Sequence, residues 1–259
     1  MAEEKLRLGG MALANGVLVH GPNAWACAVR LPDGTLKQAS AYKRFRAASV
    51  EQPLLRGPAR LAEVFTLLPE VRSRLPEARL PFERPAVAAA MVAGMAVSQV
   101  VRRSSLGAAT KELVGGLASL APAAVALRGS TLAAYHGAEH ISIGTYEHGE
   151  RREKEHERCG SHLVGPLFVT MAAGNTLAAK APEHLRGPAR LAATLGALAT
   201  STEIFAWMTR NPESRLTKLL ARPGHELQHR LATEEPTPEQ LEVAEAALAE
   251  CLRLEYEAQ

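Results

Sequence analysis

Aromatic side chains and cysteines are scarce in this sequence. Phe, Trp and Tyr make up 4% of the 259 residues, while alanine and leucine dominate. Such a composition favours closely packed helices over a β-sandwich. The three cysteines, Cys27, Cys159 and Cys251, are odd in number and far apart, which argues against a secreted disulfide framework and for a reducing, cytosolic side.

An excess of charge of one sign is also missing. The 30 Lys and Arg residues are nearly balanced by 27 Asp and Glu, and the formal net charge of +3 gives no basis for nucleic-acid binding. The segment Met1 to Leu8 alternates in charge without an apolar core, so no signal peptide is expected. A P-loop, a dinucleotide fingerprint, a G-x-S-x-G elbow and paired C-x-x-C motifs are absent too, which counts against those enzyme classes.

Residues 1–50 are expected to form a small β region. Two short apolar runs, Ala12 to His20 and Trp25 to Arg30, are separated by Gly21-Pro22-Asn23, and a second turn follows at Pro32-Asp33-Gly34. Turn residues between β-prone runs are typical of hairpins. The sequence therefore predicts a hairpin or a small three-stranded sheet.

Residues 51–211 are expected to form a helical core. Leu61 to Leu75 has the spacing of an amphipathic helix. Four further stretches carry no charge apart from Glu203, and they are Pro85 to Val101, Leu113 to Leu127, Leu163 to Ala179 and Leu191 to Met208. Helices of this kind require burial on every side. The predicted fold class is mainly α, a bundle of four or more apolar helices with a small N-terminal β-hairpin or sheet.

The same four stretches raise the question of a membrane. A spanning helix needs roughly 20 apolar residues. These stretches are shorter, rich in Ala and Gly and poor in Phe, Ile and Trp, which weakens their insertion. Composition slightly favours a soluble bundle, and two locations stay open: the cell membrane, as a multi-pass or peripheral protein with cytoplasmic-side termini, or the cytoplasm.

Residues 212–259 are expected to form a polar segment that ends in an amphipathic helix. Thr237-Pro238-Glu239-Gln240 combines a capping Thr, Pro at the first helical position and Gln three residues after the cap. Apolar residues then recur with helical spacing, so Glu242, Glu245 and Glu250 are expected to face water.

One octapeptide, Leu-Arg-Gly-Pro-Ala-Arg-Leu-Ala, occurs at Leu55 to Ala62 and again at Leu185 to Ala192. The residues that flank the two copies barely match. A reused helix start, with Pro in the first turn, therefore explains the repeat better than duplicated halves of the kind found in some transporters.

Five of the nine histidines lie between His136 and His162. His136, Glu139 and His140 form the pattern H-x-x-E-H, and in a helix these side chains share one face. This is the reversed zincin motif, in which two His bind zinc and the Glu activates a water. The segment 135–162 therefore predicts a divalent metal site, with zinc as the expected ion and Glu139 as the catalytic base.

A catalytic zinc site needs a third protein ligand, and the nearby candidates are Glu147, His156, Cys159 and His162. The spacing His156-x-x-Cys159-x-x-His162 is itself typical of ligands. In the alternative interpretation, the histidines are hydrogen-bonded residues of a bundle, and the charged run from Glu147 to Arg158, including His148, is a solvated loop. Gly137, inside the motif, would permit the close approach of another segment.

Two features outside this segment have competing interpretations. Glu203 is the lone charge in an apolar helix and requires a partner or a function, with Arg186, Arg190, the metal site or solvent as candidates. His225 and His229 stand four residues apart and could form a second metal pair, although no third ligand is near them in the sequence.

Several motifs resemble a known family. They are Gly9-Gly10-Met11-Ala12, Asn15-Gly16-Val17, Gly21-Pro22, Tyr135 to His140, Tyr146-Glu147, Arg158-Cys159-Gly160, Pro223-Gly224 and Gln240 to Ala244. In this order they resemble the bacterial YqhQ family, the domain of unknown function numbered 1385, from about Leu8 to Leu248.

The resemblance implies a metal-dependent enzyme of unassigned reaction and, in general, a multi-pass membrane protein. The family's elements map onto His136, Glu139, His140, Glu147 and Cys159. This chain departs from the pattern in its shorter and less hydrophobic helices.

The leading hypothesis is a metal-dependent hydrolase with an unknown substrate. Zinc would be bound by His136, His140 and one of Cys159, His156 or Glu147, with Glu139 as general base. The alternative is a non-catalytic, membrane-associated or scaffolding protein whose histidine cluster is a structural metal site or a polar network. The oligomeric state stays open.

Overall fold

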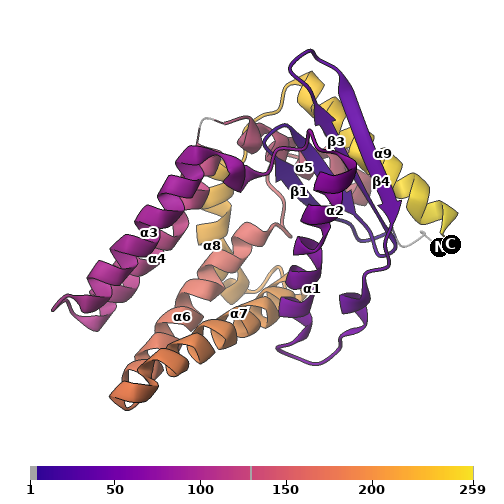
Figure 1. Ribbon diagram of the computed structural model, residues 1–259. Coiled ribbons are helices and arrows are strands. Elements are labelled where there is room, and N and C mark those ends of the chain that lie inside the picture. Colours follow the sequence, from indigo (N-terminus) through magenta and orange to yellow (C-terminus); the bar gives the residue numbers. More distant parts are fainter. Residues whose placement is uncertain (1–4, 129, 259) are drawn as a thin grey trace.

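A computed structural model describes residues 5–128 and 130–258 (Figure 1). It shows a body built on a small sheet and two helical hairpins that extend from one side of that body. The prediction of a mainly α protein with an N-terminal sheet is confirmed. The first four residues of the segment for which no signal peptide is expected lie outside the described residues.

The sheet has four antiparallel strands in the order β1 (Gly9–Leu13), β2 (Gly16–His20), β3 (Ala24–Arg30) and β4 (Leu36–Tyr42). The prediction of two or three strands was therefore too low. The apolar run from Ala12 to His20 is divided by a tight turn at Ala14-Asn15, so that Leu13 pairs with Gly16. Strand β4 has no buried residue and too little apolar alternation to signal a strand in the sequence.

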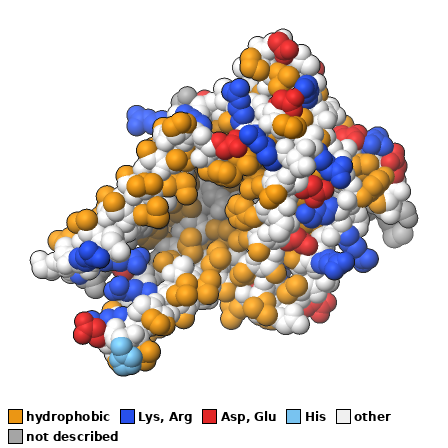
Figure 2. All heavy atoms as spheres, in the orientation of Figure 1, with side chains coloured by type: hydrophobic (Ala, Val, Ile, Leu, Met, Phe, Trp, Pro, Cys, Tyr) orange, Lys and Arg blue, Asp and Glu red, His pale blue; other side chains and the backbone are white. Residues whose placement is uncertain are grey.

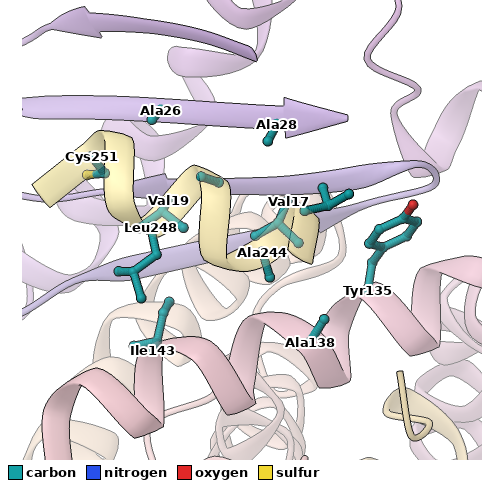
Figure 3. Close-up of a cluster of buried hydrophobic side chains, with 12 residues drawn as sticks. Val17, Val19, Ala26, Ala28, Tyr135, Ala138, Ile143, Ala244, Leu248 and Cys251 are labelled. Atoms are coloured by element: carbon teal, nitrogen blue, oxygen red, sulfur yellow. The ribbon is translucent and has the colours of Figure 1, made fainter. Parts of the chain in front are cut away.

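Side chains alternate between the two faces of the sheet along each strand. Both faces are covered by helices. One face packs against α5 (Thr131–His148) and α9 (Pro238–Glu257), as Figure 3 shows. Its buried residues are Val17, Val19, Ala26, Ala28, Tyr135, Ala138, Ile143, Val243, Ala244, Ala247, Leu248 and Cys251. The other face, with Leu18, Trp25 and Cys27, packs against α2 (Leu67–Arg74) and the segment that follows it.

The helix expected over Leu61 to Leu75 is two helices, α1 (Arg56–Phe65) and α2, which meet at Thr66. Pro69 supplies the reason, since proline has no N–H to donate to the carbonyl one turn before it. Helix α9 begins as predicted, with Thr237 accepting from Gln240 N–H and the Gln240 side chain accepting from Thr237 N–H.

The apolar stretches form two antiparallel hairpins instead of a buried bundle. The first arm pairs α3 (Pro85–Arg103) with α4 (Ala108–Leu127), and the second pairs α6 (Val164–Ala179) with α7 (Arg186–Arg210). The prediction of burial on every side was wrong. Only 11% of the most apolar 18-residue segment of α3 is buried, and only 28% of the corresponding segment within Glu183–Arg210 is buried. Figure 2 shows the hydrophobic side chains along both arms.

By length and composition, α3 and the segment Glu183–Arg210 are each able to cross a membrane. The bent pair of α4 and α5 would supply a third span if counted as one broken helix. Among the described residues, these are the segments that meet such a criterion.

The two copies of the octapeptide start α1 and α7, with Gly57-Pro58 and Gly187-Pro188 in the first turn. This agrees with a reused helix start. After α7 the chain forms α8 (Arg215–Leu227) and a single π-helical segment (Gln228–Ala232) before it enters α9. Short 3-10 turns lie at Arg46–Ser49, Pro81–Glu83, Gly160–Leu163 and Glu183–Leu185.

Candidate metal centre

Helix α5 carries the H-x-x-E-H motif, as predicted. It starts after Ser130, whose backbone is extended, and ends at Gly149, whose φ of 79° is left-handed. The helix turns His136 and His140 to one side, where their ring centroids are 4.3 Å apart. The motif therefore presents two imidazoles to the same small volume.

Backbone carbonyls fix the orientation of both imidazoles. The Nδ1–H of His136 donates to the Ala232 carbonyl at 2.8 Å, and the Nδ1–H of His140 donates to the Lys154 carbonyl at 2.6 Å. A carbonyl can only accept, so Nδ1 of each ring carries a proton, and in the neutral imidazole Nε2 is then the nitrogen that can bind an ion. Burial, followed by the nearby His136, lowers the pKa of His140 to about 2, which keeps this ring neutral.

Cys159 completes a triad of ligand atoms. Its Sγ lies 3.5 Å from Nε2 of His136, and Ser161 N–H donates to the sulfur. Ligand atoms of His136, His140 and Cys159 all lie within 4.8 Å of one another. In the part of the chain that the structure describes, this is the one group of three or more such residues with this spacing.

The donor set suits zinc, which prefers nitrogen and sulfur ligands. Burial raises the pKa of the Cys159 thiol, and a bound cation would offset this by favouring the thiolate. Three protein ligands leave a fourth position for water or substrate, which is the arrangement of catalytic zinc sites. The residues present therefore fit a zinc ion.

Glu139 lies beside this triad and is 7% exposed. Burial raises its pKa to about 7, against the opposing effect of His136. Strand β1 passes directly over it, and a Cβ on Gly10 would lie 2.3 Å from Oε1 of Glu139. The carboxyl group is thus enclosed between α5 and β1, with a pKa that suits proton exchange near neutral pH.

A cavity of about 450 Å³ opens onto these residues. His136, Glu139, His140 and Cys159 line it together with apolar side chains, among them Leu8, Met11, Leu127 and Leu132, and with the polar side chains of His156, Arg158 and Ser161. Because Leu127 is the last residue of α4, the cavity lies beside the C-terminal end of that helix.

His156 and Glu147 do not join the triad. The Nδ1 of His156 accepts from Arg158 N–H at 3.2 Å, and its Nε2–H donates to Glu147 at 3.2 Å, so both ring nitrogens are occupied. Glu147 also pairs with Arg158. These two candidates stabilise the loop that carries Cys159. His148 is exposed and bonds the Gly144 carbonyl at 2.9 Å.

His162 is also held by protein groups. Its Nδ1–H donates to the Ala221 carbonyl at 3.2 Å, and its Nε2 accepts from the Gln228 amide at 3.0 Å. Gln228 is fully buried and also bonds the His156 backbone and the Ser161 hydroxyl. Sequence reasoning missed this residue, since a single Gln gives no signal, yet it positions the loop on both sides of Cys159.

The close approach expected at Gly137 is present. A Cβ there would lie 2.2 Å from the Glu234 carbonyl, and Glu234 N–H donates to the Ala133 carbonyl at 3.0 Å. The π-helical segment and the residues after it therefore lie against α5, which brings the Ala232 carbonyl to His136.

Glu203 takes no part in this site. It accepts two hydrogen bonds from Arg56 and one from Leu54 N–H at 3.1 Å. It does have a partner, but the partner is Arg56 and neither Arg186 nor Arg190. The pair joins α1 to α7.

The second histidine pair is not arranged as a metal site. The rings of His225 and His229 are 6.3 Å apart, and Nδ1 of His229 lies 3.0 Å from Glu155. Among the described residues, no group of three potential ligands includes either of them.

Residues 130–254 match the model of a family described as protein of unknown function (DUF1385). This match supports the assignment of the chain to the DUF1385 family. The matched region holds α5, the loop with Cys159, the second arm and most of α9. The resemblance expected from Leu8 to Leu248 is thus confirmed for its C-terminal half.

A curated DUF1385 relative is the uncharacterized protein YqhQ of Bacillus subtilis (strain 168), which is 34% identical over 129 residues. The alignment covers 47% of this chain and 40% of that relative. The chain therefore corresponds to less than half of the relative's length. No solved structure gives a significant match.

Proposed function

We propose that this protein is a zinc-dependent hydrolase that works at a membrane. The observation that carries the proposal is the convergence of His136, His140 and Cys159 beside the buried carboxyl group of Glu139. The substrate enters through the cavity that these residues line.

The chemistry divides between the ligands and the base. His136, His140 and Cys159 would hold the ion, which would supply Lewis acidity toward a water or a substrate oxygen. Glu139, with its pKa raised to about 7, accepts a proton at its carboxylate oxygen near neutral pH and can return it to a leaving group. The apolar side chains of the cavity limit the access of bulk water.

The alternative is a structural metal in a non-catalytic scaffold. Structural zinc sites have four protein ligands, whereas the triad here has three and faces a cavity. This difference favours catalysis over a structural role.

The two arms support the proposed membrane association. Helix α3 has 19 residues, which corresponds to about 28 Å at 1.5 Å per residue and matches a hydrocarbon core of about 30 Å. Most of its exposed side chains are apolar, such as Val92 at 62% and Val100 at 69%. Large exposed apolar surfaces on a protein mark membrane or partner contacts.

Metal analysis of the purified protein tests the metal centre. We expect about one zinc per chain in the unmodified protein and its loss in His136→Ala, His140→Ala and Cys159→Ala. His148→Ala is the matched control, since His148 is exposed on the same helix. A protein without stoichiometric metal, or with equal content in all four variants, would refute the proposal.

Glu139→Gln separates a hydrolase from a structural site. The substitution keeps the shape of the side chain and removes the base, so we expect the metal to remain while complementation of a deletion strain fails. A variant that retains both metal and complementation would support the structural alternative.

A further inference from the structure

The two arms enclose a second cavity, remote from the metal centre. It has a volume of about 380 Å³ and is lined by residues of α3, α4, α6 and α7. Figure 2 shows the hollow between the arms. The metal triad contributes no residue to it.

The part of this cavity nearer the body is apolar. Leu120 of α4, Val164, Leu167 and Phe168 of α6, and Leu198 of α7 line it. The Phe168 ring lies so close to α4 that a Cβ on Gly116 would be 2.7 Å from it. This end offers a contact surface for hydrocarbon and, near Phe168, has little room for anything bulky.

The part nearer the tips of the arms is polar and carries a positive charge. Arg102 lies in the last turn of α3, Lys111 lies near the start of α4, and Arg190 lies near the start of α7. One carboxylate is present, that of Glu112, and it accepts a hydrogen bond from the Asn175 amide at 2.5 Å. Three cations thus face one acid, which leaves a net attraction for an anion.

We propose that this cavity binds one anionic phospholipid. The phosphate lies among Arg102, Lys111 and Arg190, and an acyl chain runs along Leu120 and Phe168 toward the body. The polarity of the cavity matches such a molecule from end to end, and basic pockets between membrane helices are typical sites for acidic headgroups. The inference rests on the membrane placement proposed above and is independent of the metal centre.

Native mass spectrometry tests the inference on the full chain in detergent micelles. Equal amounts of phosphatidylglycerol and phosphatidylcholine are added, and we expect one phosphatidylglycerol per chain in clear excess over phosphatidylcholine. The triple variant Arg102→Gln, Lys111→Gln, Arg190→Gln should lower this preference by at least about tenfold, given the usual contribution of each cation at a lipid surface. The control triple variant Arg44→Gln, Arg74→Gln, Lys218→Gln, on the body, should retain it.

Two further measurements make the result decisive. Ala172→Trp fills the cavity from α6 and should abolish lipid binding while circular dichroism stays unchanged; if this variant fails to fold, Leu120→Phe replaces it. Soluble glycerol phosphate should not displace the lipid. Displacement by it would reveal a plain anion site and overturn the proposal, as would equal binding of both lipids or an unchanged preference in the triple variant.

The lipid site and the proposed zinc-dependent hydrolase activity can be refuted separately. Lipid binding is measured in micelles and does not depend on zinc. A protein that keeps its zinc and its membrane location but shows no lipid preference would refute the lipid site alone.

Discussion

Gly137 marks the point where two distant parts of the chain touch. The Glu234 carbonyl occupies the space that a side chain at this position would need. Glycine costs a helix about 1 kcal/mol relative to alanine. The close contact that it permits is the one that brings the Ala232 carbonyl to His136.

Gly137→Ala should therefore destabilise the protein by about 1 to 3 kcal/mol despite its better helix propensity, because the Cβ would overlap backbone atoms. Gly196→Ala is the matched control, since nothing lies within 4 Å of a Cβ in that helix; it should be neutral or stabilise by up to about 1 kcal/mol. Urea unfolding measures both. Equal effects would contradict the role assigned to Gly137.

Glu255 is a fully buried carboxylate that joins α9 to the sheet. It accepts from the backbone N–H groups of Asn23 and Ala24 at 2.6 and 2.7 Å, and from the Asn23 amide at 3.0 Å. Glu255→Ala leaves these donors without a partner and should cost about 3 kcal/mol. Glu245→Ala, at an exposed position of the same helix, should change the unfolding free energy by less than about 0.5 kcal/mol.

Much of the candidate metal site was predictable at this scale, but the third residue of the triad was not. The H-x-x-E-H spacing gives His136, Glu139 and His140 directly, because a helix fixes their mutual direction. Cys159 was one of four candidates for the third ligand. The loop from Gly149 to Gly160 has no periodicity from which the direction of a side chain could be predicted. Only the hydrogen bonds of His156, Glu147 and His162 to other protein groups single it out.

At the scale of elements, Glu250 joins α9 to β4, although its position in the sequence predicts that it faces water. Glu250 is half-buried and accepts from the Ser40 hydroxyl at 2.6 Å and from Arg253. The Arg253 hydrogen bonds, together with that of Ser40, lower the pKa of Glu250 from 4.5 to about 2. The spacing of apolar residues in α9 could not predict this contact, because it does not show that β4 lies beside Glu250.

This shift predicts a pH dependence with a definite sign. A carboxylate with a lowered pKa stabilises the folded state above pH 4.5, and the contribution is lost as the pH falls toward 2. Glu250→Gln should therefore cost about 1 kcal/mol at pH 7, after allowance for solvent screening. The difference from the unmodified protein should shrink steadily between pH 4.5 and 3, as measured by urea unfolding. A difference that grows toward acid pH would contradict the assignment.

Boundaries of elements were less predictable than their existence. The capped start of α9 and the apolar helices were visible in the sequence, whereas the break at Thr66 and strand β4 were not. The break follows from Pro69 in the first turn of α2, whereas β4 depends on tertiary contacts: Lys37 and Ser40 pair with Glu77 and Glu250, residues distant in the sequence.

For the molecule as a whole, the sequence left the environment of the apolar helices open. A helix that is apolar all round fits a protein core and a membrane equally well. In the structure α3 pairs with α4 and α6 with α7 as protruding hairpins, and protein covers little of α3, which is consistent with the proposed membrane contact.

We expect the full chain to stay in the membrane fraction after washes with high salt and alkaline carbonate. Val92→Asp combined with Val100→Asp should release much of it, since each Asp at a helix centre costs about 2.5 to 3.5 kcal/mol on insertion. Tyr42→Asp with Tyr256→Asp is the control, at positions of the body that are 57% and 60% exposed. A chain that salt alone releases would contradict insertion of the arms.

Because α9 covers one face of the sheet and is the last helix to be synthesised, it also determines the order in which parts of the protein can fold during translation. Strands β1 to β4 are synthesised first, yet one of their faces stays open until the helix at Pro238–Glu257 emerges. Each arm, by contrast, pairs helices that are neighbours in the chain and is complete before α9 is synthesised. During translation both hairpins can thus form before the body can close, and a chain that stalls ahead of α9 would display an uncovered apolar sheet to chaperones and proteases.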